Sequence, residues 1–283
     1  MTAIAPRYVT EEATAELSFS VCTLVASEAK YERMLASFAR LGFDASNTEF
    51  LALDNRDANR FEGYGALRAV FPACRGEYIL FTHDDIELVD QGAEELLDVL
   101  RALEDRDPLW TVAGNAGWSA GRPEQLVLHL SDPHGTHRME GGPVEVQSLD
   151  ENFLVLPRRR MTFPSLDLEG YHLFGTDLCL QGRAAGGRAY VVPFFLHHHS
   201  GGSDSPAFRI GLDRFSTKYA HLSLPARIRA PATHVYIGAT GQALQAVDTV
   251  SRRLKDLWSR VSSRVAPKKK PLPPAAMNRK LPA

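Results

Sequence analysis

Three side chains that can bind a cation follow one another at positions 83–85, within the segment YILFTHDDIEL (78–88). Mostly apolar residues precede them, as in a central parallel strand, and open α/β sheets bind ligands outside the carboxyl ends of such strands. His83, Asp84 and Asp85 are therefore expected to line a binding site. Because adjacent carboxylates repel each other unless a cation relieves the repulsion, the ligand is predicted to be a metal ion.

A second apolar run, RAYVVPFFL (188–196), ends in three histidines at 197–199. Carboxylate oxygens combined with one or two imidazoles suit Mn²⁺ or Mg²⁺, and they suit Fe²⁺ equally well. We therefore expect Asp85, His83 and one of the three histidines to form a metal site where the two runs end.

The same side chains are compatible with an Fe(II)/2-oxoglutarate-type oxygenase. His83, Asp85 and one histidine of 197–199 would form a facial triad, and Arg209 lies where an arginine that binds an oxoacid could stand. Oxygenases of this kind need a double-stranded antiparallel barrel, whereas the residues ahead of His83 predict strand–helix units. The oxygenase is kept as an alternative hypothesis.

The first hundred residues alternate between strand and helix patterns. The predicted elements are strands at 17–25, 48–55 and 77–83, and helices at 30–42, 66–76 (interrupted near Pro72) and 92–104. This order predicts a parallel sheet with right-handed crossovers. Short strands from Leu109 onward predict a mixed or antiparallel extension. The last predicted elements are a helix at 175–187, a strand at 188–202 and a helix at 241–262.

Composition and charge narrow the classes of function. No apolar run approaches the roughly 18 residues of a membrane span. The N-terminus has no charged-then-apolar signal, so we expect a cytoplasmic protein. Cys22, Cys74 and Cys179 are odd in number and far apart, which predicts reduced core residues. Acidic groups outnumber basic ones before residue 250, which argues against nucleic-acid binding.

The end of the chain has the opposite charge. Residues 250–283 contain ten Lys or Arg and one Asp, against 22 basic and 33 acidic residues elsewhere. The predicted helix 241–262 carries an apolar stripe, and a basic amphipathic helix can lie on an anionic membrane surface. Peripheral contact with the inner face of a membrane is therefore predicted. The alternative is that Leu254, Leu257 and Trp258 pack on the body of the protein.

Transfer from a nucleotide sugar is the other chemistry that the two polar clusters could serve, because a divalent cation neutralises a diphosphate leaving group without proton transfer. The order of elements, HDD after the third strand and GYHLFGTDLCLQGRAAGGRAYVVPFFLHHHSGG (170–202) resemble family 2 glycosyltransferases of the type A fold. The resemblance covers roughly residues 18–202 and is strongest to the StrF-like branch, which has a His-x-Asp variant of the Asp-x-Asp motif.

This resemblance implies an α/β fold, with a mostly parallel central sheet flanked by helices, and roles for individual residues. Asp85 matches the second acid of the motif and is the expected metal ligand, with His83 at the first position. His199, or else His197, would complete the metal site or face the diphosphate. Asp177 occupies the place of the catalytic base. The expected donor-binding residues are Thr23, Val25, Ser27, Asp54, Asn55 and Asp84, with Arg68 as a candidate phosphate contact.

The sequence therefore predicts a metal-dependent, inverting glycosyltransferase that uses Mn²⁺ or Mg²⁺ and a UDP-linked sugar donor. Its product would be a surface polysaccharide or a secondary metabolite, and its acceptor an unknown glycan, lipid-linked or small molecule. A protein that binds a sugar nucleotide without catalysis is a second alternative, because His83 replaces the first acid of the motif.

Five segments are expected along the chain. They are a flexible N-terminus (1–16), a nucleotide-sugar-binding half (17–108), an acceptor-side half with the histidines (109–240), an amphipathic helix (241–265) and a disordered basic tail (266–283).

Overall fold

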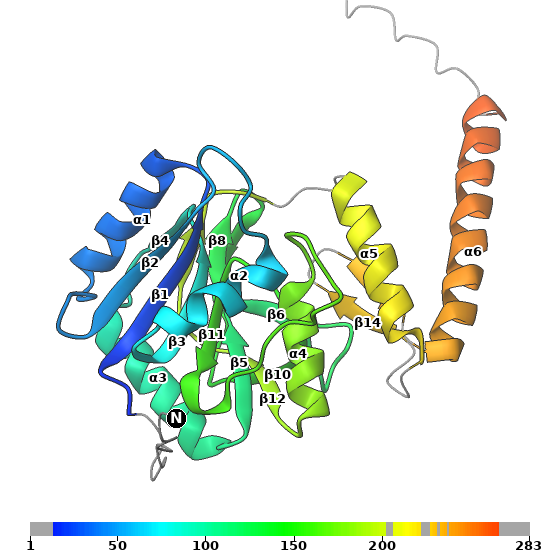
Figure 1. Ribbon diagram of the computed structural model, residues 1–283. Helices are drawn as coiled ribbons and strands as arrows, with labels where there is room; N and C mark the ends of the chain where they lie inside the picture. The colour runs from blue at the N-terminus through cyan, green and yellow to red at the C-terminus, as the bar shows by residue number, and fades with distance from the viewer. Residues whose placement is uncertain (1–13, 202–205, 222–226, 231–232, 237, 266–283) are drawn as a thin grey trace, which may run out of the picture.

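The computed structural model describes residues 14–201, 206–221, 227–230, 233–236 and 238–265 (Figure 1). Its first elements alternate as predicted: β1 (Leu17–Val25), α1 (Glu28–Arg40), β2 (Thr48–Asp54), α2 (Gly63–Val70), β3 (Gly76–His83) and α3 (Ala93–Arg106). β1 lies between β2 and β3 and pairs in parallel with both. The predicted parallel start of the sheet is confirmed.

Strands from the second half of the chain extend this sheet. They are β5 (Trp110–Gly114), β6 (Ala116–Ser119), β7 (Leu126–Leu128), β10 (Val144–Leu149), β11 (Phe153–Pro157) and β12 (Arg188–Val191). The nine strands run in the order β2-β1-β3-β11-β5-β12-β10-β6-β7. β11 is antiparallel to both β3 and β5, whereas β12 is parallel to β5, so the extension is mixed as predicted.

A second, smaller sheet was not predicted. It contains β4 (Ile86–Leu88), β13 (Leu196–His198), β8 (Leu130–Asp132) and β9 (Gly135–His137), in that order. The segment 188–202, predicted as one strand, is therefore split: β12 belongs to the large sheet and β13 to the small one. Pro193 lies in the break, where the lack of a backbone N–H rules out a continuous hydrogen-bond ladder.

Two helix boundaries follow from local chemistry. α2 begins at Gly63, three residues earlier than predicted, because the Glu62 carboxylate accepts hydrogen bonds from the backbone N–H groups of Tyr64 and Gly65. The helix ends at Val70, and Pro72 lies in the 3₁₀ turn Phe71–Ala73 that follows it. The predicted interruption at this proline is confirmed.

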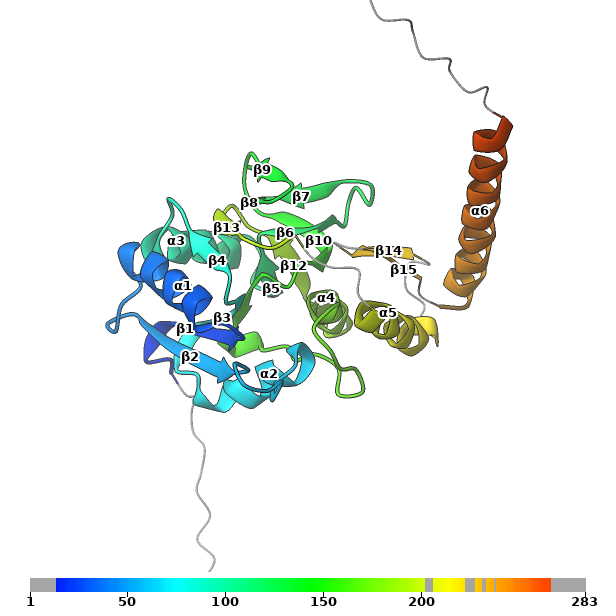
Figure 2. The same cartoon turned by 90° about the horizontal axis from the view of Figure 1, so that it is seen from above.

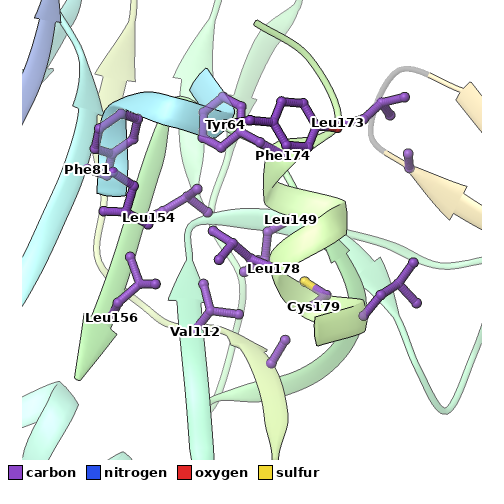
Figure 3. Close-up of a cluster of buried hydrophobic side chains, with 14 of the residues drawn as sticks. Tyr64, Phe81, Val112, Leu149, Leu154, Leu156, Leu173, Phe174, Leu178 and Cys179 are labelled. Carbon is purple, nitrogen blue, oxygen red and sulfur yellow. The ribbon is translucent and has the colours of Figure 1, made fainter. Parts of the chain in front are cut away.

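Alternation of side chains along the central strands creates two hydrophobic cores. Cys22 of β1 and Ile79 and Phe81 of β3 face α2 and α4 (Phe174–Ala184). The adjacent residues Val21 of β1 and Leu80 of β3 point to the other side of the sheet and face α1 and α3. Figure 2 shows these helices on the two sides of the sheet. In the first core, the ring of Phe174, at the start of α4, packs edge-on against Tyr64 and Phe81, and Leu178 and Cys179 of the same helix belong to this cluster (Figure 3). This packing anchors α4 behind the ends of the central strands.

The remaining elements lie beyond α4. They are α5 (Pro206–Lys218), the hairpin of β14 (Arg227–Ala230) and β15 (Thr233–Tyr236), and α6 (Gly238–Val265). Of these the sequence predicted α6 alone. α6 extends away from the body of the protein (Figures 1 and 2), and no described helix is both long and apolar enough to cross a membrane.

The three cysteines are buried and form no disulfide, as the sequence predicted.

Candidate metal and nucleotide-sugar site

A cavity of about 720 Å³ lies where β1, β3 and β13 end. Polar side chains make up a large part of its wall: Asn55, Asn59, His83, Asp84, Asp85, Asp132, His134, His137, Asp150, Glu151, Asn152, His172, His198 and Ser200. The apolar part of the wall includes Leu24, Ala26, Leu128, Phe174 and Phe208. The prediction that the ends of the central strands line a binding site is consistent with this cavity.

Three side chains converge inside the cavity. His198 Nε2 lies 3.3 Å from Asp85 Oδ1 and 3.3 Å from His83 Nδ1, and His83 Nδ1 lies 3.9 Å from Asp85 Oδ1. Asp85 and His198 are buried, whereas His83 remains partly exposed to the cavity. One carboxylate oxygen and two imidazole nitrogens therefore share one small volume.

This donor set fits a divalent cation. Ligands about 2.1 Å from an octahedral ion lie about 3 Å apart when they are adjacent, close to the separations observed here. Two imidazoles and one carboxylate suit Mn²⁺, Fe²⁺ or Zn²⁺ better than Mg²⁺, which prefers oxygen ligands. The open side of the cavity leaves room for ligand atoms from a substrate.

The protonation states also favour a cation. Burial and the neighbouring His198 lower the pKa of His83, which keeps its imidazole neutral and able to bind a metal. Burial acts to raise the pKa of Asp85, but the hydrogen bond from His198 and the nearby Lys30 ammonium, together with the other neighbouring groups, outweigh it. The pKa of Asp85 is thus held well below its usual range, and the carboxylate is ionised.

The histidine in this group is His198, in place of the predicted His199 or His197. Successive side chains of a strand point to opposite faces, and β13 presents His198 alone to Asp85. His197 Nδ1 lies 2.7 Å from Ser131 Oγ, and His199 Nε2 lies 2.7 Å from Glu87 Oε1. The predicted metal ligand His199, or else His197, is therefore replaced by the adjacent His198.

The same alternation affects the residues expected at the end of β1. Thr23 is fully buried, with its hydroxyl 2.9 Å from Thr82 Oγ1, and Val25 belongs to the core on the α1 side. Leu24 and Ala26 line the cavity in their place. Ser27 is the N-cap residue of α1, and its backbone N–H donates to Asp84.

Asp84 contributes to the wall of the cavity but is engaged with the backbone. Its Oδ2 accepts hydrogen bonds from Ala26 N (2.8 Å) and Ser27 N (2.9 Å). These bonds hold the loop after β1 against the end of β3. The structure thus gives Asp84 a positioning role in addition to its place in the wall.

The other expected donor-binding residues are dispersed. Asn55 lines the cavity, and its amide bonds to the backbone of Arg60 and Phe61. Asp54 is exposed outside the lining and pairs with Arg56, whose hydrogen bonds lower the pKa of Asp54 to about 2. Arg68 donates to the carbonyls of Pro164 and Ser165, away from the cavity. Of these three, Asn55 alone lies at the site.

Asp177, the expected catalytic base, has no exposed surface and does not line the cavity. It accepts hydrogen bonds from Ser165 N (2.6 Å), Ser165 Oγ (2.8 Å) and the hydroxyl of Tyr219. Burial raises the pKa of Asp177 even though these bonds act to lower it. This placement does not fit the expected role: Asp177 holds the loop before α4 and the 3₁₀ turn Tyr219–His221 after α5, and it lies outside the cavity lining.

Sequence reasoning missed the turn between β10 and β11, where Asp150, Glu151 and Asn152 line the cavity. Three consecutive polar residues between two apolar strands were a signal, but the loops that connect strands are commonly polar for solvation alone. Only the fold shows that this turn lies beside His83, whose backbone N–H donates to Asn152 O (3.0 Å).

The architecture is that of known sugar-transferring enzymes. A mannosyltransferase from Pyrobaculum calidifontis, solved with GDP-Man and Mn²⁺, superposes with a TM-score of 0.50 at 11% identity, over 75% of this chain and 66% of that one. This chain thus spans slightly less than two thirds of its length. S. aureus TarS 1–349 with UDP-GlcNAc gives a TM-score of 0.48 at 13% identity, over 74% and 68% of the two chains. The chain has the type A glycosyltransferase fold.

A sequence relative defines the family. The protein named ATP synthase subunits region ORF 6, from Fuscovulum blasticum, is 46% identical over 200 residues, which cover 69% of this chain and 80% of that protein. The chain belongs to the same family as this protein, whose name describes no activity. No protein-family model matches the chain.

The first prediction concerns the histidine that completes the metal site. His198→Ala should weaken Mn²⁺ binding by more than the roughly 10- to 100-fold that the loss of an outer partner of a metal ligand costs. His199→Ala is the matched control, directly after the end of β13, and should bind Mn²⁺ as the unmodified protein does. Titration followed by the electron paramagnetic resonance of free Mn²⁺ measures both. Equal loss in the two variants would contradict the assignment.

The second prediction concerns Asp177. Asp177→Ala leaves the Ser165 N–H and the Tyr219 hydroxyl without their acceptor, so the free energy of unfolding should fall by about 3 kcal/mol. Asp167 is an exposed aspartate of the loop before α4 that contains Ser165. Asp167→Ala should change the free energy of unfolding by less than about 1 kcal/mol. Urea unfolding measures both. A stable Asp177→Ala protein that lacks sugar transfer would restore the base role.

Proposed function

We propose that this protein is a metal-dependent glycosyltransferase that moves a sugar from a nucleotide-diphosphate donor to a hydroxyl acceptor. The observation that carries the proposal is the convergence of His83, Asp85 and His198 in a cavity at the strand ends of a type A glycosyltransferase fold. Open α/β sheets bind ligands at this edge.

The side chains have separable tasks in this proposal. His83, Asp85 and His198 hold the cation, which when bound neutralises negative charge on the diphosphate. Leu24, Ala26 and Asn55 form the wall beside the ends of β1 and β2, and we assign the nucleoside to that wall. Asp84 keeps the wall in place through its bonds to the loop after β1. We propose a UDP-linked donor, transfer with inversion, and Mn²⁺ ahead of Mg²⁺ because of the two imidazoles.

α6 supports a proposal about location. Its described apolar side chains Leu244, Val247, Val250 and Leu254 share one stripe and are 43–62% exposed, so they do not pack on the body. Its C-terminal half is rich in arginine and lysine, of which Arg253 and Lys255 are exposed. An apolar stripe with basic flanks is complementary to an anionic membrane surface. We propose that α6 docks the protein on the cytoplasmic face of a membrane. Residues 266–283, predicted as a disordered tail, lie outside the described residues.

This location is compatible with an acceptor that is itself attached to a membrane. We therefore propose synthesis of a surface polysaccharide or of a related secondary metabolite, with a glycan, a lipid-linked sugar or a small hydroxyl compound as acceptor. The cavity wall near Phe208 of α5, on the side away from β1, is available for that acceptor.

The described part of the chain does not have the architecture that the oxygenase alternative requires. Its donor set of two imidazoles and one carboxylate is present, but the open nine-stranded sheet is not the barrel that such enzymes need. Arg209, the candidate oxoacid partner, is exposed and does not line the cavity. A protein that binds a sugar nucleotide without catalysis would have the same site. The two hypotheses differ in one result, the release of nucleotide from a donor, which only the transferase would catalyse.

The third prediction tests the donor. Isothermal titration calorimetry should detect UDP binding in the presence of Mn²⁺ and lose it with a chelator or in His198→Ala. The same titration with GDP in place of UDP shows which of the two nucleotides the site binds. No binding of either nucleotide, together with binding of 2-oxoglutarate in the presence of Fe²⁺, would support the oxygenase.

The fourth prediction tests the membrane contact with vesicles that contain phosphatidylglycerol. Leu254→Glu should weaken cosedimentation roughly tenfold or more, because it removes from the apolar stripe one leucine that the bilayer would bury. Gln245→Glu adds the same charge on the opposite side of α6 and should have a smaller effect. Equal effects would mean attraction by charge alone, and no binding by the full chain would exclude membrane docking.

A further inference from the structure

With Asp177 outside the cavity, the proposed reaction lacks a group that accepts the proton of the acceptor hydroxyl. Five described carboxylates line the cavity: Asp84, Asp85, Asp132, Asp150 and Glu151. Four of them have other partners. Asp84 accepts two backbone N–H groups, and Asp85 belongs to the metal site. Asp132 caps the turn to Gly135, and Asp150 accepts from both nitrogens of Asn152.

Glu151 differs from the other four. Its side chain accepts a hydrogen bond from Gly175 N (3.2 Å), in the first turn of α4, and the residue keeps partial exposure to the cavity. The N-terminus of a helix favours a negative charge, so α4 holds the carboxylate in place and supports its ionised form. Neither Lys nor Arg pairs with Glu151 in the described part of the chain, which leaves the carboxylate able to take a proton.

The backbone around Gly175 has no room for a side chain that could do this task instead. A Cβ atom at Gly175 would lie 2.7 Å from Leu149 O and 3.3 Å from Glu151 Oε1. Leu173, two residues earlier, has a left-handed φ of 69°, and such outliers gather at functional sites. The start of α4 is therefore shaped around the carboxylate of Glu151.

Glu151 also lies close to the metal site. The next residue, Asn152, accepts the backbone N–H of His83 at 3.0 Å, which places the turn 150–152 alongside the end of β3. The side-chain Oδ1 of Asn152 is buried without a hydrogen-bond partner among the described residues. The backbone of Asn152, and not its enclosed side-chain oxygen, therefore ties the turn to β3.

We propose that Glu151 is the general base of the transfer reaction, an inference that rests on the proposed function. The Glu151 carboxylate removes the proton from the acceptor hydroxyl as the acceptor oxygen bonds to the anomeric carbon of the donor sugar. The bond between that carbon and the diphosphate oxygen breaks, and the nucleoside diphosphate leaves with the electron pair. The proton remains on Glu151 until solvent removes it.

The surroundings of Glu151 suit this task. Burial and the charge of Asp150 raise the pKa of Glu151 to about 8, although backbone N–H groups, that of Gly175 first, act in the opposite direction. The other ionisable groups that face it are Tyr64 of α2 and Cys179 of α4, both neutral because burial raises their pKa values. A base with a pKa near the working pH is the most effective. Because the ionised form acts, the rate should rise with pH and level off above about 8.

The fifth prediction uses water as the acceptor, so it does not need the natural one. UDP-glucose, UDP-GlcNAc and GDP-mannose are incubated with Mn²⁺, and the released nucleoside diphosphate is measured. Glu151→Gln, which keeps the shape of the side chain, should slow release by at least about 100-fold. Its binding of UDP or GDP with Mn²⁺ should stay unchanged. Glu145→Gln, an exposed glutamate on β10, is the matched control and should release nucleotide at the unmodified rate.

Azide distinguishes a base from a residue that only maintains structure. Azide attacks the anomeric carbon without losing a proton, so it should restore nucleotide release in Glu151→Gln and yield a glycosyl azide. Slow release that azide does not restore would overturn the proposal. A rate of the unmodified protein that stays constant between about pH 6 and pH 9 would overturn it without any variant.

Failure of the proposed function gives a different result. If the unmodified protein binds neither UDP nor GDP with Mn²⁺, the transferase proposal itself fails. If it binds them, and Glu151→Gln releases nucleotide at the unmodified rate, only the role of Glu151 fails. If the unmodified protein binds nucleotide but releases none from any donor, with or without azide, it is a binding protein, and the general-base role of Glu151 is excluded.

Discussion

Asp84 joins the ends of β1 and β3 by accepting hydrogen bonds from the backbone N–H groups of Ala26 and Ser27. The two strands pair in parallel, with Thr23 opposite Thr82 and Leu24 opposite His83. This pairing brings the loop after β1, which forms one wall of the cavity, next to the first residue of the metal site. A one-residue change in register would turn Leu24 away from the cavity and move Thr23 into it. The geometry of the wall therefore depends on this junction.

The carboxylates near the cavity show how burial and partners divide similar groups among different tasks. Asp84 accepts two backbone N–H groups, and Asp85 is kept ionised by the hydrogen bond from His198 and by Lys30. Asp177 is enclosed in the core with Ser165 and Tyr219. Glu151 is the one that combines access to the cavity with a raised pKa and a hydrogen bond from the first turn of α4. Residue type alone does not separate these four groups, whereas their hydrogen-bond partners do.

The small sheet is the second structural condition for the site. β4 and β13 pair antiparallel, with His198 opposite Ile86, so the histidine reaches the segment that directly follows Asp85. The backbone N–H of His199 donates to Asp85 O at 3.0 Å, which locks this pairing beside the metal site. The break at Pro193 makes this possible, because it releases the chain from the large sheet after β12 and lets it join β4.

The class of fold, the parallel start of the sheet and the segments that supply the metal site could all be predicted from the amino-acid sequence. Apolar runs that end in His83–Asp85 and in the three histidines are local patterns, and strand ends of one sheet collect at one edge. Tertiary structure decided which of the neighbouring side chains face the cavity: His198 in place of His199, and Leu24 in place of Thr23. These choices depend on strand register and on a break at Pro193, which no periodicity of a single strand specifies. Tertiary structure also places Asp177 in the core, because the 3₁₀ turn after α5 supplies Tyr219. It brings the turn at Glu151 to the site, because β11 pairs with β3 across a long sequence separation.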